Sequence, residues 1–374
     1  MGARWTLIAI ALIGSACKAS SPTPTPTPTS MTKAQLGSAA FVDQNLSQPA
    51  GQACADCHTA SRAFTDPESD HSTSAGAVAG RFGPRNAPTA MYTRYVPPLH
   101  FDDRAQQFVG GLFWDGRVDT LEDQASRPLV NPLEMNNPDK GAVVTALRGA
   151  SYADAFRSIY GATSLDDIDQ AFAHLMDAIA TYERTTDLSP FSSKYDHYLA
   201  GTAKLTDQEM RGLAIFEDPA RGNCASCHPS RPTADGNPPL FTNFTYANLG
   251  IPRYMNSVFF TQPPALNPDG DAFVDHGLMT TVGDAKEDGK FRVPTLRNVA
   301  RTGPYGHNGY FENLEYFISF LNTRDVGSPE TGPWAPPEVA ANVDVRVGHL
   351  GLSEQDINDL LAFLATLNDD LPPP

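Results

Sequence analysis

The sequence predicts a mainly α-helical protein with long loops, built from two similar domains. Apolar residues recur at helical spacing in several segments, whereas the alternation that is typical of strands is sparse. Glycine and proline together number 61 of 374 residues, so long loops are expected between modest helices. One pentapeptide pattern occurs twice, 170 residues apart, and each copy is expected to belong to its own domain.

Three helices can be placed from their first residues. Segments 164–167, 206–209 and 353–356 each carry the pattern of a capping box, in which side chains satisfy the free amides of a helix start. Apolar residues follow all three at helical spacing. Between the first two of these helices, segment 187–194 is the predicted domain boundary.

The repeated pentapeptide is Cys-X-X-Cys-His, in which two thiols can bond covalently to a haem and the adjacent histidine can ligate its iron. Its two copies comprise Cys54, Cys57, His58, Cys224, Cys227 and His228. Cys-X-X-Cys pairs also form zinc sites, thioredoxin-like redox motifs and structural disulfides. The adjacent histidine in both copies favours two covalently bound c-type haems, and therefore two cytochrome c-like haem domains.

The beginning of the chain resembles an export signal. Arg4 precedes an apolar run over residues 6–16, which is too short to span a bilayer as a mature helix. Small residues then precede Cys17, as at a bacterial lipoprotein cleavage site, although Gly14 stands where leucine is usual. We expect residues 1–17 to be a signal peptide of the lipoprotein type, with an ordinary signal peptide as the alternative. The expected location is the bacterial periplasm, with membrane contact through a lipid anchor on Cys17.

Residues 18–33 form a linker rich in proline and threonine. This composition favours extended polyproline II and suits a stalk that holds the protein off a membrane. The net charge of −16 argues against a nucleic-acid partner and suits a basic electron-donor protein. Two domains of residues 34–188 and 189–374 are expected to follow.

From about residue 36 onward the chain resembles the bacterial dihaem cytochrome c peroxidase and MauG family. Besides the two haem motifs, six ordered segments carry the resemblance, at residues 63–66, 85–89, 113–117, 131–135, 293–298 and 304–309. The resemblance implies that peroxide reacts at the haem of domain 34–188, and that the haem of domain 189–374 transfers electrons.

The resemblance also implies roles for individual residues. Glu134 matches the family's catalytic carboxylate, Gln124 its distal glutamine, and Trp114 the tryptophan between the haems. A carboxylate near the iron can take a proton from bound peroxide and return it to the leaving oxygen. A solvated charge and an ordinary core aromatic are the alternatives for Glu134 and Trp114.

The family binds a calcium ion between its haems. Its ligand positions map to the Asn86 side chain and to the Thr302 and Pro304 carbonyls. These hard oxygen ligands are those that calcium prefers.

Two departures from the family pattern bear on the haems. Classical members carry a histidine that blocks the first iron until reduction, but segment 74–80 contains none, and His71 is off register and interpreted as a surface residue. The first haem is therefore expected to be open. The second haem's distal ligand in the family is methionine or tyrosine, where this chain has Leu321. Either this haem is five-coordinate, or Tyr316, Met279 or Met255 substitutes, or the register is shifted.

Three functions are compatible with these residues. The first is a peroxidase that reduces hydrogen peroxide with electrons from a small cytochrome c or cupredoxin, relayed through the second haem. The second is a MauG-like enzyme that uses peroxide to oxidise Trp or Tyr side chains of a partner protein. The third is a non-catalytic dihaem electron-transfer protein, which Gln124, Glu134 and Trp114 disfavour.

Overall fold

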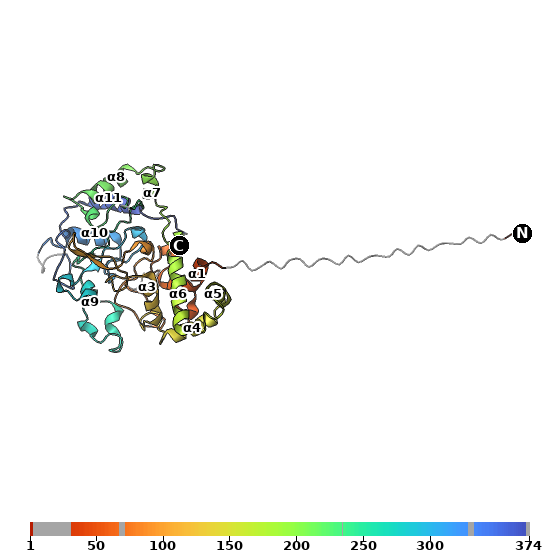
Figure 1. The fold of residues 1–374 in the computed structure, drawn as a ribbon. Helices are drawn as coiled ribbons and strands as arrows, with labels where there is room; N and C mark the ends of the chain where they lie inside the picture. The colour runs from red at the N-terminus through yellow and green to blue at the C-terminus, as the bar shows by residue number, and fades with distance from the viewer. Residues whose placement is uncertain (3–30, 67–71, 234, 328–332, 372–374) are drawn as a thin grey trace. The chain divides into compact units, whose positions relative to one another are not determined.

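The computed structural model describes residues 1–2, 31–66, 72–233, 235–327 and 333–371 (Figure 1). Almost all of the expected signal peptide and of the Pro/Thr-rich linker lies outside the described residues, as does His71. Over the described part of the chain, none of the helices combines the length and the apolar character needed to span a bilayer.

The described chain is mainly helical, as the sequence predicts, with two small antiparallel sheets. The helices are α1 (Lys33–Phe41), α2 (Cys54–Cys57), α3 (Leu121–Val130), α4 (Lys140–Arg148), α5 (Ala153–Tyr160), α6 (Ile168–Glu183), α7 (Lys194–Leu199), α8 (Asp207–Glu217), α9 (Leu278–Val282), α10 (Leu314–Thr323) and α11 (Glu354–Ala365). The sheets pair β1 (His100–Asp102) with β2 (Gln107–Val109), and β3 (Tyr246–Ala247) with β4 (Phe291–Arg292). Long loops and short 3₁₀ turns connect them.

The N-terminal half is built around the crossing of α1 and α6. A Cβ atom at Gly37 of α1 would lie 1.9 Å from the Ala178 carbonyl oxygen of α6, so only glycine permits this approach. Around the crossing, Leu36, Phe41 and Leu175 are buried in one apolar core. The first Cys-X-X-Cys-His motif follows α1 directly and is held against this core.

The C-terminal half repeats this plan with α8 and α11. A Cβ atom at Gly212 of α8 would lie 2.0 Å from the Asp359 carbonyl oxygen of α11. The Arg211 guanidinium also pairs with the Asp359 carboxylate at 2.7 Å. The second motif follows α8 as the first follows α1 (Figure 1). Each haem motif is therefore positioned by a helix pair whose close contact requires a glycine.

The helix starts agree with two of the three predicted capping boxes. Thr206 with Glu209 and Ser353 with Asp356 form reciprocal boxes at the starts of α8 and α11. The box predicted at 164–167 is wrong, because Asp167 is itself the N-cap of α6 and its side chain accepts from the Gln170 amide. Ser164, Asp166 and Asp167 can each serve as an N-cap, which made the first residue of that helix ambiguous.

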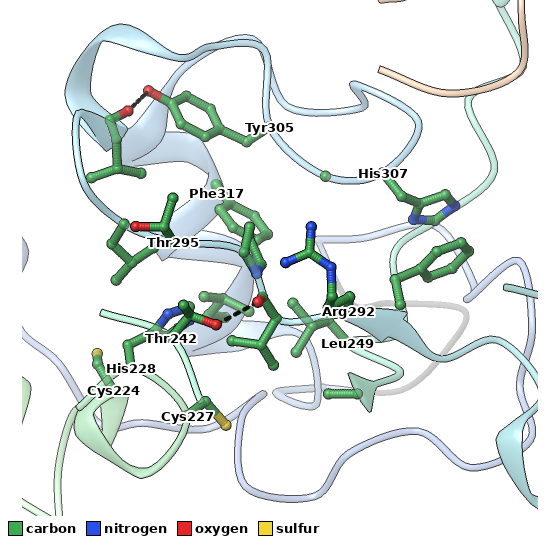
Figure 2. A pocket seen from close by; sticks show the side chains of 18 of the residues that line it. Cys224, Cys227, His228, Thr242, Leu249, Arg292, Thr295, Tyr305, His307 and Phe317 are labelled. Atoms are coloured by element: carbon green, nitrogen blue, oxygen red, sulfur yellow. Dashed lines mark hydrogen bonds between the residues drawn. The ribbon is translucent and has the colours of Figure 1, made fainter. Parts of the chain in front are cut away.

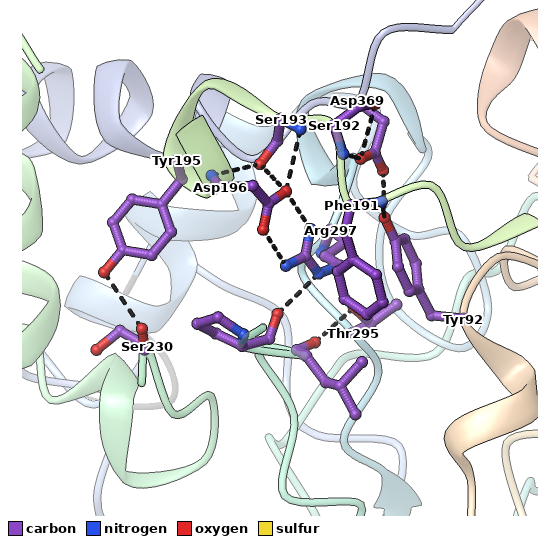
Figure 3. A network of polar contacts seen from close by, with 12 residues as sticks. Tyr92, Phe191, Ser192, Ser193, Tyr195, Asp196, Ser230, Thr295, Arg297 and Asp369 are labelled. Carbon is purple, nitrogen blue, oxygen red and sulfur yellow. Dashed lines mark hydrogen bonds and ion pairs between the residues drawn. The ribbon is translucent and has the colours of Figure 1, made fainter. Parts of the chain in front are cut away.

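A buried polar network ties the two halves together (Figure 3). Arg297 is fully buried and donates to both carboxylate oxygens of Asp196, at 2.9 and 2.7 Å. The Asp369 carboxylate accepts from the Tyr92 hydroxyl at 2.7 Å and from the Asn298 side chain at 2.8 Å. Tyr92 belongs to the first core and Asp369 lies beyond residue 195, so the hydrogen bond between them crosses the predicted boundary. The boundary itself stays a prediction.

The glycine at the α8–α11 crossing gives a direct test of this architecture. We predict that Gly212→Ala lowers the midpoint of thermal unfolding by at least about 3 °C, because overpacking costs about 1–3 kcal/mol and outweighs the gain in helix propensity. Gly83→Ala is the matched control, since a Cβ atom there would meet nothing within 4 Å. Far-UV circular dichroism of the holoprotein measures both, and an unchanged midpoint in Gly212→Ala would contradict the close crossing.

Candidate functional site

The first Cys-X-X-Cys-His motif folds as one helical turn that presents its histidine. Both cysteines lie in α2, and the His58 amide donates to the Cys54 carbonyl at 2.9 Å. His58 Nδ1 lies 3.0 Å from the Phe64 carbonyl oxygen, which can only accept, so Nδ1 carries the proton. The other ring nitrogen, Nε2, is then left with a lone pair, which is the form that ligates iron.

The second motif has the same local geometry. It begins with a 3₁₀ turn at Cys224–Ser226, and the His228 amide donates to the Cys224 carbonyl at 2.9 Å. His228 Nδ1 donates to the Phe241 carbonyl oxygen at 2.8 Å. Burial lowers the pKa of His228 to about 4, so the ring is neutral near pH 7 and Nε2 is available as a ligand.

A large cavity adjoins the second motif (Figure 2). Its volume is about 240 Å³, and Cys224, Cys227 and His228 all form part of its wall. Most of the remaining wall is apolar, including four side chains of α10. Two thiols and a neutral imidazole on the wall of an apolar cavity fit a covalently attached haem.

The donor chemistry of the motifs fits haem better than zinc or a disulfide. All four motif cysteines are free thiols. Burial raises the pKa of Cys54, Cys57 and Cys224 to about 12, which disfavours the thiolates that zinc requires. Across the described ranges, no three His, Cys, Asp or Glu side chains gather as a metal-binding group.

Glu134 lies within electrostatic range of the first motif. Its charge contributes, after burial, to the raised pKa of both Cys54 and Cys57. Burial also raises the pKa of Glu134 itself, although the Arg117 charge and a hydrogen bond with Asn131 act in the opposite direction. A carboxyl group with a raised pKa holds a proton more firmly than an ordinary glutamate, which suits a group that accepts a proton and then returns it.

Segment 74–80 packs between the first motif and Glu134. The Ala77 amide donates to the Glu134 carbonyl at 2.8 Å, and the Gln52 side chain donates to the Ala75 carbonyl at 2.6 Å. A Cβ atom at Gly76 would lie only 2.4 Å from the Leu133 carbonyl oxygen. This segment, which the sequence places where classical members carry a blocking histidine, therefore lies against the candidate catalytic residue and contains no imidazole.

Gln124 and Glu134 lie on one continuous stretch of chain, formed by α3 and the turn that follows it. Gln124 lies in α3, and Pro128 lies in the last turn of the same helix. The chain then folds back, so that the Met135 amide donates to the Pro128 carbonyl at 3.1 Å and the Glu134 amide to the Asn131 carbonyl at 3.0 Å. The catalytic roles of Gln124 and Glu134 stay predictions.

Trp114 is held between the two halves of the molecule. Its indole Nε1 donates to the Asn86 carbonyl at 2.8 Å, and its own carbonyl accepts from the Arg292 amide at 2.8 Å. The side chain lines the cavity beside the second motif. Trp114 is therefore anchored to the N-terminal half through Asn86 and to the C-terminal half through β4, and its role between the haems stays a prediction.

Arg292 is a residue that the sequence analysis missed. It is only 8% exposed and lines the cavity, yet none of the described acidic side chains forms an ion pair with it. Its Nε donates to the Phe113 carbonyl at 3.2 Å. Figure 2 shows its guanidinium group across the cavity from Cys224 and Cys227. The propionates of a haem lie on the edge opposite its thioether bonds, so this guanidinium fits a propionate. The position of Arg292 directly before segment 293–298 is the sequence feature that could have identified it.

The three predicted calcium ligands also converge. Asn86, Thr302 and Pro304 all line the cavity, and Asn86 Nδ2 lies 2.6 Å from the Pro304 carbonyl oxygen. Reversing the amide places Oδ1 at this position, because the nitrogen and oxygen of an asparagine are assigned from their partners alone. The side-chain oxygen and the two carbonyl groups would then form a partial oxygen shell of the kind calcium takes.

Leu321 lines the cavity together with His228, as its predicted register requires. None of the suggested substitutes does so. Tyr316 and Met255 are 44% and 69% exposed, and Met279 in α9 is not part of the wall.

Comparisons with known proteins agree with this geometry. A family model described as di-haem cytochrome c peroxidase matches residues 31–204. The methylamine utilization protein MauG of Paracoccus denitrificans (strain Pd 1222) is 41% identical over 351 residues, which cover 90% of this chain and 88% of that protein. The cytochrome c551 peroxidase of Nitrosomonas europaea is 27% identical over 340 residues, covering 91% and 80%.

A solved structure extends the likeness to the fold. The diheme peroxidase BthA from Burkholderia thailandensis E264 superposes with a TM-score of 0.79 at 35% identity, covering 92% of this chain and 87% of that one. The similarity thus extends over both halves of the chain. The chain therefore belongs to the di-haem cytochrome c peroxidase family, as an oxidoreductase that carries two c-type haems and uses peroxide as its oxidant.

Proposed function

We propose that this protein reduces hydrogen peroxide at the haem attached to Cys54 and Cys57, with electrons that arrive through the haem attached to Cys224 and Cys227. The observation that carries this proposal is the half-buried Glu134, whose carboxyl pKa is raised and which lies in electrostatic range of the first motif. A haem at this motif supplies the iron at which the O–O bond of peroxide is cleaved by two electrons.

In this proposal Glu134 moves the protons of the reaction. Its carboxylate accepts a proton from one peroxide oxygen and returns it to the other, which leaves as water. Two electrons and two protons in total convert one hydrogen peroxide into two waters. Gln124, on the helix that precedes Glu134, is proposed to orient peroxide through its side-chain amide.

The relay between the haems is assigned to Trp114. Its indole is fixed by hydrogen bonding to the Asn86 carbonyl and lines the cavity of the second motif. Arg292 would hold that haem by a propionate, and its amide donates to the Trp114 carbonyl. Asn86 and Arg292 would thereby keep the Trp114 side chain in a fixed position relative to the second haem.

The proposed electron donor is a small cytochrome c or cupredoxin with a basic surface, since the chain has a net charge of −16. The proposed location is the bacterial periplasm, where such donors and c-type haem attachment occur. A lipid anchor at Cys17, followed by the linker of residues 18–33, is proposed to hold the enzyme at a membrane.

A second candidate is a MauG-like enzyme that withdraws electrons from Trp or Tyr side chains of a partner protein. Two observations favour it specifically. One is the 41% identity to a methylamine utilization protein MauG. The other is segment 74–80, which packs against Glu134 without a histidine, so that the first haem would be open before any reduction.

The two candidates are separated by steady-state turnover of the holoenzyme. The oxidation of reduced cytochrome c by peroxide is followed with and without prior reduction of the enzyme. The proposed function predicts catalytic oxidation of the donor, and the open first haem predicts that turnover starts without a lag in the unreduced enzyme. If peroxide is consumed but no reduced donor protein is oxidised, the MauG-like oxidation of a protein substrate would be favoured instead.

Glu134 provides the sharpest test of the catalytic step. We predict that Glu134→Gln retains both haems and slows peroxide turnover at least about tenfold, which is the low end of acid–base contributions. Because burial raises the Glu134 pKa, wild-type activity should fall as the pH falls through a value above that of an ordinary glutamate, and the variant should lack this acid limb. Glu122→Gln, at the start of α3 and paired with Arg184, is the control. A variant with the wild-type rate would show that Glu134 is not the proton carrier.

We also propose that a calcium ion binds at Asn86, Thr302 and Pro304, and this proposal makes a separate prediction for Asn86. Asn86→Ala should weaken calcium binding at least about tenfold, whereas Asn86→Asp, which keeps a side-chain oxygen, should retain it. Calcium content after dialysis and isothermal titration of the chelator-treated holoprotein measure both variants. Equal affinities for wild type and Asn86→Ala would place the ion elsewhere.

A further inference from the structure

One face of α10 lines the cavity that adjoins the second motif. The side chains on that face carry no atom that can ligate iron. Leu314, Phe317, Ile318 and Leu321 recur at intervals of three and four residues, so they share one face of the helix, and all four line the cavity. The rotation of α10 is fixed, because the next residue, Asn322, is buried and its side chain bonds to both the amide and the carbonyl of Leu352. Leu321 is thereby directed to the cavity.

The tyrosines of the cavity wall are directed away from it. The Tyr305 hydroxyl donates to the Val299 carbonyl at 2.7 Å, and Figure 2 shows its ring extending away from His228. The Tyr92 hydroxyl donates to the Asp369 carboxylate at 2.7 Å (Figure 3).

Met91 and His307 are the other lining side chains, besides the motif residues, with a sulfur or an imidazole. The Met91 sulfur lies 3.4 Å from the Asn298 side-chain nitrogen. The His307 ring stacks on Phe291 at 3.6 Å, and neither of its nitrogens has a hydrogen-bond partner. Figure 2 shows His307 beyond Arg292 as seen from His228. Neither Met91 nor His307 belongs to the face of α10 that lines the cavity.

We propose that the distal side of the second haem is an open, apolar coordination site that binds a neutral diatomic ligand such as carbon monoxide, nitric oxide or dioxygen. The inference rests on the haem attachment at Cys224 and Cys227 in the proposed function. The four apolar side chains of α10 cannot hydrogen-bond to a ligand. A charged ligand would lose its hydration there without compensation, so this wall favours a neutral ligand. The haem that relays electrons is then also a ligand-binding centre.

The test is a carbon monoxide titration of the dithionite-reduced holoprotein, with haem content measured separately as the pyridine haemochrome. Wild type should bind one carbon monoxide more per chain than Leu321→Met, because a methionine sulfur placed on the cavity face of α10 closes the ferrous iron. Tyr316→Met puts the same thioether on the exposed face of α10 and should bind as wild type does.

The outcomes distinguish the inference from the function on which it rests. Two haems per chain with equal carbon monoxide binding in wild type and Leu321→Met would overturn the open site while leaving the proposed function standing. Fewer than two haems per chain would overturn both. If Leu321→Met does not fold, the ferric wild-type electron paramagnetic resonance spectrum decides: a high-spin second haem supports the open site, and a low-spin one overturns it.

Discussion

Asn86 makes three hydrogen-bonding contacts at the seam, the set of contacts between the N-terminal and C-terminal halves. Its amide donates to the His307 carbonyl, its side chain contacts the Pro304 carbonyl, and its own carbonyl receives the indole proton of Trp114. One residue of the N-terminal half thereby fixes both a loop of the C-terminal half and the aromatic ring between the motifs. Arg85, its neighbour in sequence, adds a bidentate ion pair with Asp275 at 2.7 and 2.8 Å.

The two halves share a local plan but differ in what surrounds the motif. In each half a helix crosses another at a glycine, and the histidine of the motif donates through Nδ1 to a backbone carbonyl. The first motif is faced by a carboxyl group with a raised pKa, whereas the second adjoins an apolar wall and the buried cation of Arg292. In the proposed function, residues outside the repeated part assign proton chemistry to one copy of the scaffold and electron transfer to the other.

Local sequence patterns predict the features that depend on neighbours in the chain. The boxes at Thr206 and Ser353 and the two motifs involve residues within a few positions of each other, so a short pattern specifies them. Arg292 could not be predicted in this way, because its burial and its missing acidic partner arise only when β4 packs against segment 113–114. The close approach of Gly76 to Leu133 is likewise a contact between distant segments. The resemblance to a family located Glu134, Gln124 and Trp114, but their catalytic roles stay predictions.

The hydrogen bond between Tyr92 and Asp369 spans 277 residues of the chain. A contact of such sequence separation forms late, since a long loop must close before it is made. During synthesis and export, the N-terminal half therefore emerges well before the residue that satisfies its buried hydroxyl group. Until Asp369 has been synthesised, the Tyr92 hydroxyl has no carboxylate to which it can donate, so this contact between the two halves forms only after the C-terminal half has been made.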